Sequence, residues 1–167
     1  GQGFRIQVPG RDSISNLPWH QDSSYWAVTP CKVVTVWLAI DKVDISNSAM
    51  KFIPGSHIYG HINWKYTNKD AVLNQEIIDV NKFNKPFYNI LDPGSISIHS
   101  DLIIHGSDAN LSNKRRCGLA LRYTIPEVNP LDKEYLKLSY YLRGEFLESN
   151  WKNNTIPKTN DLNYKKI

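Results

Sequence analysis

The sequence has few cysteines and no long apolar run. Its 167 residues include only two cysteines, Cys31 and Cys117, which lie far apart along the chain. Two isolated cysteines do not make a disulfide framework or a zinc ribbon, and we expect reduced thiols in a cytoplasmic protein. No stretch approaches the roughly 20 consecutive apolar residues that a membrane-spanning helix requires, and no charged-then-apolar leader is present. We therefore expect no membrane partner.

Concentrated basic charge is also lacking. The formal net charge is +4, and the only tight basic cluster is Lys114-Arg115-Arg116. A nucleic-acid-binding barrel needs a basic patch, usually with aromatic residues interleaved on a strand face, and neither a long basic run nor such a face is evident. We therefore expect no nucleic-acid partner.

What the sequence does contain is a series of short strand-like segments. Hydrophobic residues make up 41% of the chain and aromatic residues 11%, which suits one domain with a substantial core. Turn signals separate the segments without intervening helices, a pattern that favours an all-β barrel or sandwich. Residues 31–40 (CKVVTVWLAI) are nearly apolar on both faces, which predicts a central strand. The strand-like segments are 4–8, 31–40, 49–54, 95–100, 102–107 and 117–126.

Two regions depart from this pattern. Residues 69–79 read as a helix or an excursion from the barrel, and residues 131–142 carry apolar side chains at nearly helical spacing. We expect a core over residues 1–130, with residues 131–167 as a helical or irregular extension of the same domain. The chain begins with glycine and enters a strand-like segment almost at once, so we also expect a fragment whose N-terminal part is missing.

A first candidate site lies in the segment WHQDSSYW. In a strand, alternate side chains share a face, so His20 and Asp22 point the same way and Gln21 points elsewhere. A histidine and a carboxylate on one face can bind a metal ion. The pair alone is weak evidence, because this spacing also occurs by chance.

The other histidines differ in their surroundings. His57 and His61 flank Gly60, which favours a loop with surface histidines, and a strand histidine such as His99 is usually structural. His105 is followed by a turn that ends in arginines where the next strand begins. Two histidines and one carboxylate on one face of a metal leave three positions open, which suits Fe(II) binding a bidentate organic acid and O2. The arginine supplies a planar fork for the far carboxylate of that acid.

These motifs together resemble a known family. The blocks WHQDSSYW, VWLAIDKVDISNSAMKFIPGSH and DPGSISIHSDLIIHGSDANLSNKRRCGLALRY are similar, in order and spacing, to the phytanoyl-CoA dioxygenase family of Fe(II)/2-oxoglutarate-dependent oxygenases. The resemblance covers about residues 4–126. It implies an all-β core folded as a double-stranded β-helix, a jelly-roll or cupin-like barrel, with peripheral helices. It also implies that the protein hydroxylates an unactivated carbon of a small organic substrate. The reaction would require Fe(II), consume the cosubstrate 2-oxoglutarate and O2, and release succinate and CO2.

The resemblance also assigns residues. It implies that the metal ligands are His20, Asp22 and His105. Halogenating members of the family carry a small residue in place of the carboxylate, so Asp22 favours hydroxylation. The family usually has glycine where this chain has Ser48. The residues implied to bind or line the cosubstrate are Arg116, Ser107, Gln21 and Trp37.

Strand alternation adds an independent expectation. If Arg116 points inward, then Gly118, Ala120 and Arg122 share its face, and the small residues leave room for a cosubstrate. Arg122 is then a second inward cation, which touches substrate or cosubstrate or pairs with a barrel carboxylate. The aromatic residues that follow Asp22 face the substrate or pack the barrel end; they are Tyr25 and Trp26.

Two other functions stay open. A cupin-like metal enzyme that does not use 2-oxoglutarate would keep the histidines, but it would not need Arg116 at its spacing from His105. A non-catalytic small-molecule-binding module on the same fold is the other alternative, and the intact His-Asp-His set argues against it. The substrate cannot be specified from the fold and the cofactor chemistry.

Overall fold

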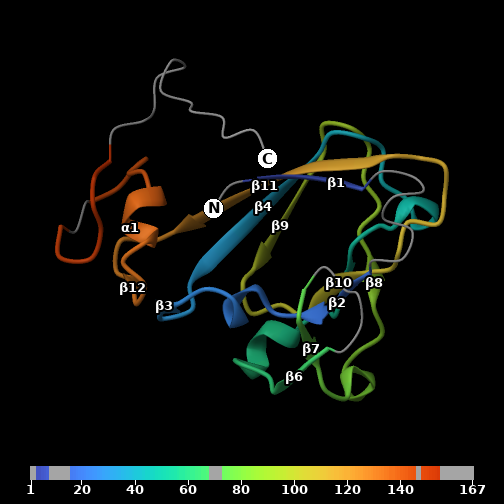
Figure 1. Ribbon diagram of the computed structural model, residues 1–167, viewed down its shortest axis with the longest axis horizontal. Coiled ribbons are helices and arrows are strands. Elements are labelled where there is room, and N and C mark those ends of the chain that lie inside the picture. The colour runs from blue at the N-terminus through green and yellow to red at the C-terminus, as the bar shows by residue number, and fades with distance from the viewer. Residues whose placement is uncertain (1–2, 8–15, 68–72, 146–147, 155–167) are drawn as a thin grey trace.

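A computed structural model describes residues 3–7 (backbone only), 16–67, 73–145 and 148–154, and these form two four-stranded antiparallel sheets (Figure 1). The expected all-β core is therefore confirmed. We call the sheets the long sheet and the short sheet. The long sheet has the order β1 (Gly3–Gln7), β11 (Arg116–Thr124), β4 (Val33–Ala39) and β9 (Ile96–Ser100). The short sheet has the order β2 (Leu17–His20), β10 (His105–Ser107), β5 (Lys51–Phe52) and β8 (Phe87–Tyr88).

Strand β4 lies between β11 and β9, so its predicted central position is confirmed. Both of its faces carry apolar side chains, as the sequence shows, but only one face is buried. The inner face, which includes Thr35 and Trp37, is buried, whereas Val34 on the outer face is 39% exposed. Ile98 on the neighbouring strand is 64% exposed on the same outer face. The outer side chains suit a pleated strand by their branching rather than by burial.

The core lies on the inner side of the sheets and consists of two clusters of apolar side chains. Burial of these side chains supplies the main driving force that holds the sheets together. One cluster contains Trp37, Ala39, Val43, Ala49 and Met50, with Phe52 packed against it. The other contains Ile53, Ile77 and Ile104, with Trp19 among its neighbours.

A bulge in β2 sets the register of the short sheet. His105 lies opposite His20, but Ser107 lies opposite Leu17, so β2 has one more residue than β10 between these pairs. The two backbones approach closely at Gly106, where a Cβ would lie 2.7 Å from the carbonyl oxygen of Leu17. Glycine is therefore the residue that fits here. As a result, two histidines distant in sequence lie side by side.

Two short ribbons complete the β-structure. Strand β3 (Val28–Thr29) pairs with β12 (Asn129–Pro130), and β6 (Trp64–Tyr66) pairs with β7 (Gln75–Ile77). The helical interpretation of residues 69–79 is thus wrong at 75–77, while residues 69–72 lie outside the described part. Ile77 is buried in the second core cluster, and tertiary pairing overrides the local helical pattern.

Helices are short and peripheral. The only α-helix in the described residues is α1 (Tyr135–Leu138), which is shorter than the spacing over 131–142 predicts. Residues 155–167 of the expected extension lie outside the described part. None of the described helices has the length and apolar character needed to cross a bilayer. The 3-10 helices are η1 (Asp22–Ser24), η2 (Ile45–Asn47), η3 (Ser56–Tyr59) and η4 (Val80–Lys82).

Candidate functional site

Three potential metal-binding side chains converge between the two sheets. His20 ends β2, Asp22 begins η1 and His105 begins β10, and all three are buried. The distance from His20 Nε2 to Asp22 Oδ1 is 3.7 Å, and that from His105 Nε2 to the same oxygen is 3.8 Å. One ligand atom from each residue lies within 4.8 Å of the others, and no other such group occurs among the described residues.

Backbone carbonyl groups orient both imidazole rings. The Nδ1 atom of His20 lies 2.7 Å from the carbonyl oxygen of Pro18, and Nδ1 of His105 lies 3.1 Å from that of Ile103. Because a carbonyl oxygen only accepts hydrogen bonds, each Nδ1 carries the proton and donates it. The lone pair of each ring then resides on Nε2, which faces Asp22. A hydrogen bond from Nδ1 to a backbone carbonyl group, with Nε2 left free to bind, is typical of metal-binding histidines.

The pKa values of Asp22 and His105 suit a cation. Burial, and after it the neighbouring His20, lower the pKa of His105 to about 3, and Asp22 offsets this only in part. Burial alone would raise the pKa of Asp22, but a hydrogen bond with His20 and electrostatic interactions with His105, His20 and Arg122 hold it well below its usual value. At neutral pH His105 is therefore neutral and Asp22 is ionised, the forms in which these residues bind metal ions.

A hydroxyl group from the opposite sheet fixes Asp22. Thr35 Oγ1, on the inner face of β4, donates a hydrogen bond of 3.2 Å to Asp22 Oδ2. The other carboxylate oxygen, Oδ1, faces the two histidines. The bond ties the candidate centre to the long sheet and leaves one oxygen directed at the place where the imidazole rings converge.

The donor set fits a divalent transition metal such as Fe(II). Two imidazole nitrogens and one carboxylate oxygen lie within 4.8 Å of one another, without a thiolate, and this 2-His-1-carboxylate set is the non-haem iron pattern. Ser107, two residues after His105, is buried, and its Oγ has no hydrogen-bond partner in the part of the chain that the structure describes. A buried hydroxyl of this kind suits a polar ligand beside the metal.

Arg116 lies buried at the start of β11, with its guanidinium carbon 5.8 Å from the centre of the Trp37 ring. The same ring covers Gly118, where a Cβ would lie 2.0 Å from Trp37 Cζ2. The predicted inward face of Arg116 and Gly118 is thus confirmed. Arg115 faces outward, as alternation predicts, and makes two hydrogen bonds of 2.8 Å with Asp41.

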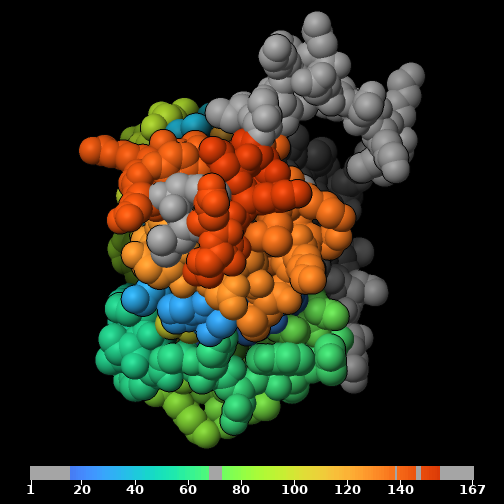
Figure 2. Space-filling model, turned by 90° about the vertical axis from the view of Figure 1, so that its left-hand side faces the viewer, coloured from blue at the N-terminus to red at the C-terminus, as the bar shows by residue number. Residues whose placement is uncertain are grey.

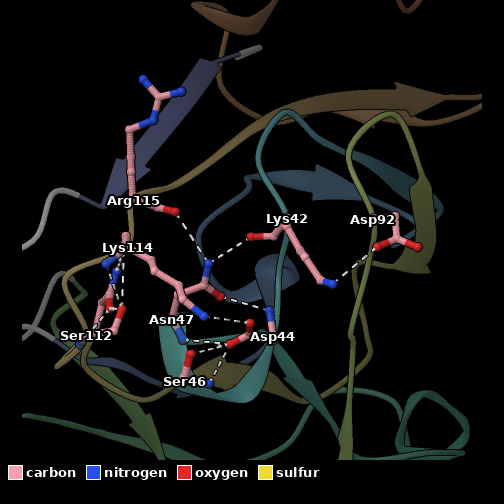
Figure 3. Close-up of polar contacts among 9 residues, drawn as sticks. Lys42, Asp44, Ser46, Asn47, Asp92, Ser112, Lys114 and Arg115 are labelled. Atoms are coloured by element: carbon pink, nitrogen blue, oxygen red, sulfur yellow. Dashed lines mark hydrogen bonds and ion pairs between the residues drawn. The ribbon is translucent and has the colours of Figure 1, made fainter.

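A hydrogen-bonded turn holds the chain that leads into Arg116 (Figure 3). The buried amide of Asn47 donates to the carbonyl oxygens of Lys42 at 2.7 Å and Arg115 at 3.4 Å, and accepts from the backbone N–H of Asp44. Ser48 follows in the left-handed conformation, with φ of 74°. This turn fixes the backbone one residue before the buried arginine.

Gln21 does not point towards the three converging ligands. Its amide nitrogen donates to the carbonyl oxygens of Gly60 and Leu102, at 2.8 and 2.6 Å, and its oxygen accepts from the backbone N–H of Ile62. The buried Gln21 side chain therefore links the backbone around Gly60 and Ile62 to that at Leu102. It does not lie at the cosubstrate position that the resemblance implies. Strand alternation had already separated it from His20 and Asp22.

Of the two aromatic residues after Asp22, Tyr25 lies beside the candidate centre and Trp26 lies on Arg122. The ring of Tyr25 lies 6.0 Å from that of His20, and its hydroxyl oxygen accepts a 3.1 Å hydrogen bond from the backbone of Gln75. Trp26 lies against the guanidinium group of Arg122, whose Cζ is 5.0 Å from the ring centre. Both aromatic residues are half-buried.

The structure adds residues that the sequence did not single out as part of the site. Phe52 lies 5.7 Å from the His105 ring and 4.9 Å from the His99 ring, measured between ring centres. Burial lowers the pKa of His99 to about 4, so this residue is neutral at pH 7. His99 lies opposite Thr35, and their shared inner face follows from strand alternation once the pairing is known. Phe52 had no comparable signal, because it depends on pairing between β5 and β10.

The two other histidines and the cysteines match expectation. His57 and His61 are exposed beside a turn, and both cysteines are free thiols. His61 Nε2 lies 3.0 Å from Cys31 Sγ, a contact outside the candidate centre.

The fold and the site define a class: a double-stranded β-helix protein with a buried His-Asp-His set between its sheets. The chain belongs to the phytanoyl-CoA dioxygenase (PhyH) family, whose model matches residues 5–118. Proteins of this family are Fe(II)- and 2-oxoglutarate-dependent oxygenases.

Individual relatives agree with this assignment. A phytanoyl-CoA dioxygenase domain-containing protein 1 homolog of Caenorhabditis elegans is 32% identical over 108 residues, which are 58% of this chain and 36% of that protein. The peroxisomal phytanoyl-CoA dioxygenase of Bos taurus is 25% identical over 124 residues, 72% of this chain and 37% of the relative. The chain thus spans little more than a third of these curated relatives. The solved non-heme monooxygenase ThoJ is 27% identical with a TM-score of 0.65, covering 78% of this chain and 47% of ThoJ.

Proposed function

We propose that the chain forms the core of an Fe(II)- and 2-oxoglutarate-dependent dioxygenase that hydroxylates an unactivated carbon of a small organic substrate. In the balanced reaction, substrate, O2 and 2-oxoglutarate give hydroxylated substrate, succinate and CO2. The observation that carries the proposal is the buried convergence of His20, Asp22 and His105, with both Nε2 atoms oriented by backbone carbonyl groups.

Each part of the site has a role in this proposal. His20, Asp22 and His105 hold Fe(II), which supplies the activation of O2 that protein side chains cannot provide. Arg116 pairs with the remote carboxylate of 2-oxoglutarate, because a buried guanidinium binds a carboxylate with two parallel hydrogen bonds. The cosubstrate also meets the side chains of Ser107 and Trp37.

Other residues prepare this arrangement. Thr35 holds one oxygen of Asp22 so that the other faces the histidines. The missing side chain at Gly118 lets Trp37 lie flat beside Arg116, which keeps the guanidinium in place and excludes water from it. Gln21 supports the segment that carries two of the ligands by fixing it to the backbone of Gly60 and Leu102.

The proposal extends to the organisation and location of the chain. Residues 1–130 form the oxygenase core, and residues 131–167 are an extension of the same domain. Free thiols at Cys31 and Cys117 support a reducing compartment such as the cytoplasm. The basic residues beside Arg116 are engaged with carboxylates, Lys114 with Asp44 and Arg115 with Asp41, which supports a substrate other than nucleic acid.

Anaerobic titration of the purified chain with Fe(II) and 2-oxoglutarate tests the proposal. A weak visible charge-transfer band from the chelate is expected in the wild-type protein. His105→Ala is expected to abolish the band, and Arg116→Ala to weaken 2-oxoglutarate binding at least tenfold. Arg115→Ala is the matched control, because it removes the neighbouring arginine from the exposed face.

Thermal unfolding of each variant separates loss of the site from loss of the fold. A folded protein that binds iron without forming the band would reject the use of 2-oxoglutarate and favour the cupin-like alternative. A folded protein that binds no iron would reject the enzyme and favour a binding module.

A further inference from the structure

Arg122 is a second inward cation that the cosubstrate site does not use. We propose that Arg122, stacked on Trp26, binds an anionic group of the substrate, so that the enzyme acts on a small organic anion such as a carboxylate. This inference rests on the proposed function and specifies its substrate class.

The strand register places Arg122 beside the candidate metal centre. Arg122 lies opposite Thr35 on β4, and His99 lies opposite Thr35 on the other side. Residues directly opposite in antiparallel strands project to the same face, so all three side chains share the inner face of the long sheet. The hydroxyl group of Thr35 contacts Asp22 at 3.2 Å. Arg122 is therefore one side chain away from a candidate ligand.

Trp26 holds the guanidinium group in a defined orientation. The ring stacks on Arg122 at 5.0 Å, and both residues are half-buried. A guanidinium group has five N–H donors, so Arg122 can donate to a planar anion in addition to the interactions that it already makes. The stack thus combines an apolar surface with N–H donors for an anion, the combination that a small amphiphilic anion requires.

The stack lies at one end of the molecule. Trp26 precedes β3, and Arg122 lies near the C-terminal end of β11, which points towards the region of β3 and β12 (Figure 1). Viewed from that side, the N-terminal segment around β3 (blue) lies between the C-terminal region (orange) and the region of β6 and β7 (teal to green) (Figure 2). Three parts of the chain therefore meet around the segment of β3, which Trp26 precedes.

Electrostatics agree with this position. The positively charged Arg122 lies on the same inner face as Thr35 and His99. The positive potential of Arg122 thus reaches the side chains around the centre. An anion seated on Arg122 would lie in that potential, where an uncharged analogue gains much less.

The position of Arg116 separates the two arginines in function. Both lie on the inner face of β11, but six residues of extended strand separate their Cα atoms by about 20 Å. Gly118 and Ala120 occupy the inner positions between them. Arg116 is therefore placed to bind the cosubstrate, whereas Arg122 is placed to bind a different molecule beyond Gly118 and Ala120.

Carboxylate binding to the Fe(II)/2-oxoglutarate-loaded chain, under anaerobic conditions, tests the proposal. The probes are phenylacetate and octanoate, each paired with its uncharged amide. Calorimetry gives affinity, and the visible chelate band reports any change near the metal. We expect at least one carboxylate to bind at least tenfold more tightly than its amide. Arg122→Gln should abolish this difference and leave 2-oxoglutarate affinity unchanged, while Arg115→Gln, an exposed control, should change neither.

Three results would overturn the proposal. The first is that neither carboxylate binds the loaded wild-type protein better than its amide. The second is that Arg122→Gln keeps the preference for the carboxylate. The third is that Arg122→Gln weakens 2-oxoglutarate binding, which would assign Arg122 to the cosubstrate. Failure of the proposed function would look different, because the wild-type protein would then show no chelate band before any carboxylate is added. Trp26→Leu provides a second variant, expected to reduce the carboxylate affinity severalfold by removing the stack.

Discussion

Gly118 leaves no room for a side chain beneath the Trp37 ring, close to Arg116. A Cβ there would lie 2.0 Å from Cζ2 and 2.3 Å from Cε2 of Trp37. Gly118→Ala is therefore expected to displace the indole ring and to lower the free energy of unfolding by about 1–3 kcal/mol, the usual cost of overpacking. Chemical denaturation measures this loss.

Trp37→Phe supplies the control for this prediction, because phenylalanine lacks the indole atoms that would clash. In the double variant, the cost of the alanine should be smaller than in the wild-type background. Additive effects of the two substitutions would show that the contact between residues 37 and 118 is not the cause.

Asp101 is a second residue for which we make a prediction, because its buried carboxyl group makes the stability of the protein depend on pH. It is fully buried, and its Oδ2 has no hydrogen-bond partner in the described residues. Burial raises the pKa of this carboxyl group, and hydrogen bonds from Val33 and Ser100 offset the effect only in part. Because the folded-state pKa is raised, the folded protein binds the proton more tightly, and stability falls as pH rises from about 3.9 through the folded-state pKa.

Asp101→Asn is therefore expected to stabilise the protein at pH 7 by about 1 kcal/mol, because it removes a buried negative charge. The gain should disappear below about pH 3.9, where the aspartic acid is protonated in both states. Urea denaturation at pH 7 and pH 3 measures both values. Asp92→Asn is the control, because the Asp92 side chain is 80% exposed. An equal effect of Asp101→Asn at both pH values would contradict the account.

At the level of single residues, the sequence predicted the candidate ligands better than their neighbours. The expected convergence of His20, Asp22 and His105 is found, but the strand premise is wrong for Asp22, because β2 ends at His20 and Asp22 begins η1. Gln21 was assigned to the cosubstrate, yet local alternation directs it into the loops. The role of Phe52 was not predictable, because it depends on a strand partner that no local pattern identifies.

Among the elements, the turn formed by η2 is hydrogen-bonded to the residue that precedes β11, through Asn47 and the carbonyl oxygen of Arg115. Asn47→Ala would leave the backbone N–H of Asp44 and the carbonyl oxygen of Lys42 without their amide partner. We expect a loss of about 1–3 kcal/mol in the free energy of unfolding, because buried polar groups then lack hydrogen bonds. Ser46→Ala is the matched control: its hydroxyl bond to Asp44 is exposed and should contribute little. Equal losses for the two variants would contradict a special role for Asn47.

The elements also show where sequence patterns were insufficient. The strand β11 over Arg116–Thr124 matched its apolar pattern, because both local preference and pairing favour a strand. The segment at Gln75–Ile77 has helix-compatible residues but pairs with Trp64–Tyr66. The bulge in β2 has no visible sequence signal except Gly106 on the partner strand, since a close backbone approach involves two segments distant in sequence.

For the whole molecule, the sequence predicted the all-β class but not the one-sided burial of the long sheet. Its outer face carries Val34, Ile96 and Ile98, all at least 39% exposed, although their side chains are apolar. Composition cannot distinguish a strand buried on both faces from one buried on a single face. Pairing of β2 with β10 within the short sheet brings together His20 and His105, which lie 85 positions apart in sequence, and so forms the candidate centre.

The most direct test of this account is an anomalous diffraction map, at the iron absorption edge, from crystals of the chain grown anaerobically with Fe(II) and 2-oxoglutarate. The account predicts one peak at bonding distance from His20 Nε2, His105 Nε2 and a carboxylate oxygen of Asp22, with the remote carboxylate of 2-oxoglutarate on Arg116. A peak bound to other residues, or a cosubstrate whose remote carboxylate lies away from Arg116, would contradict it.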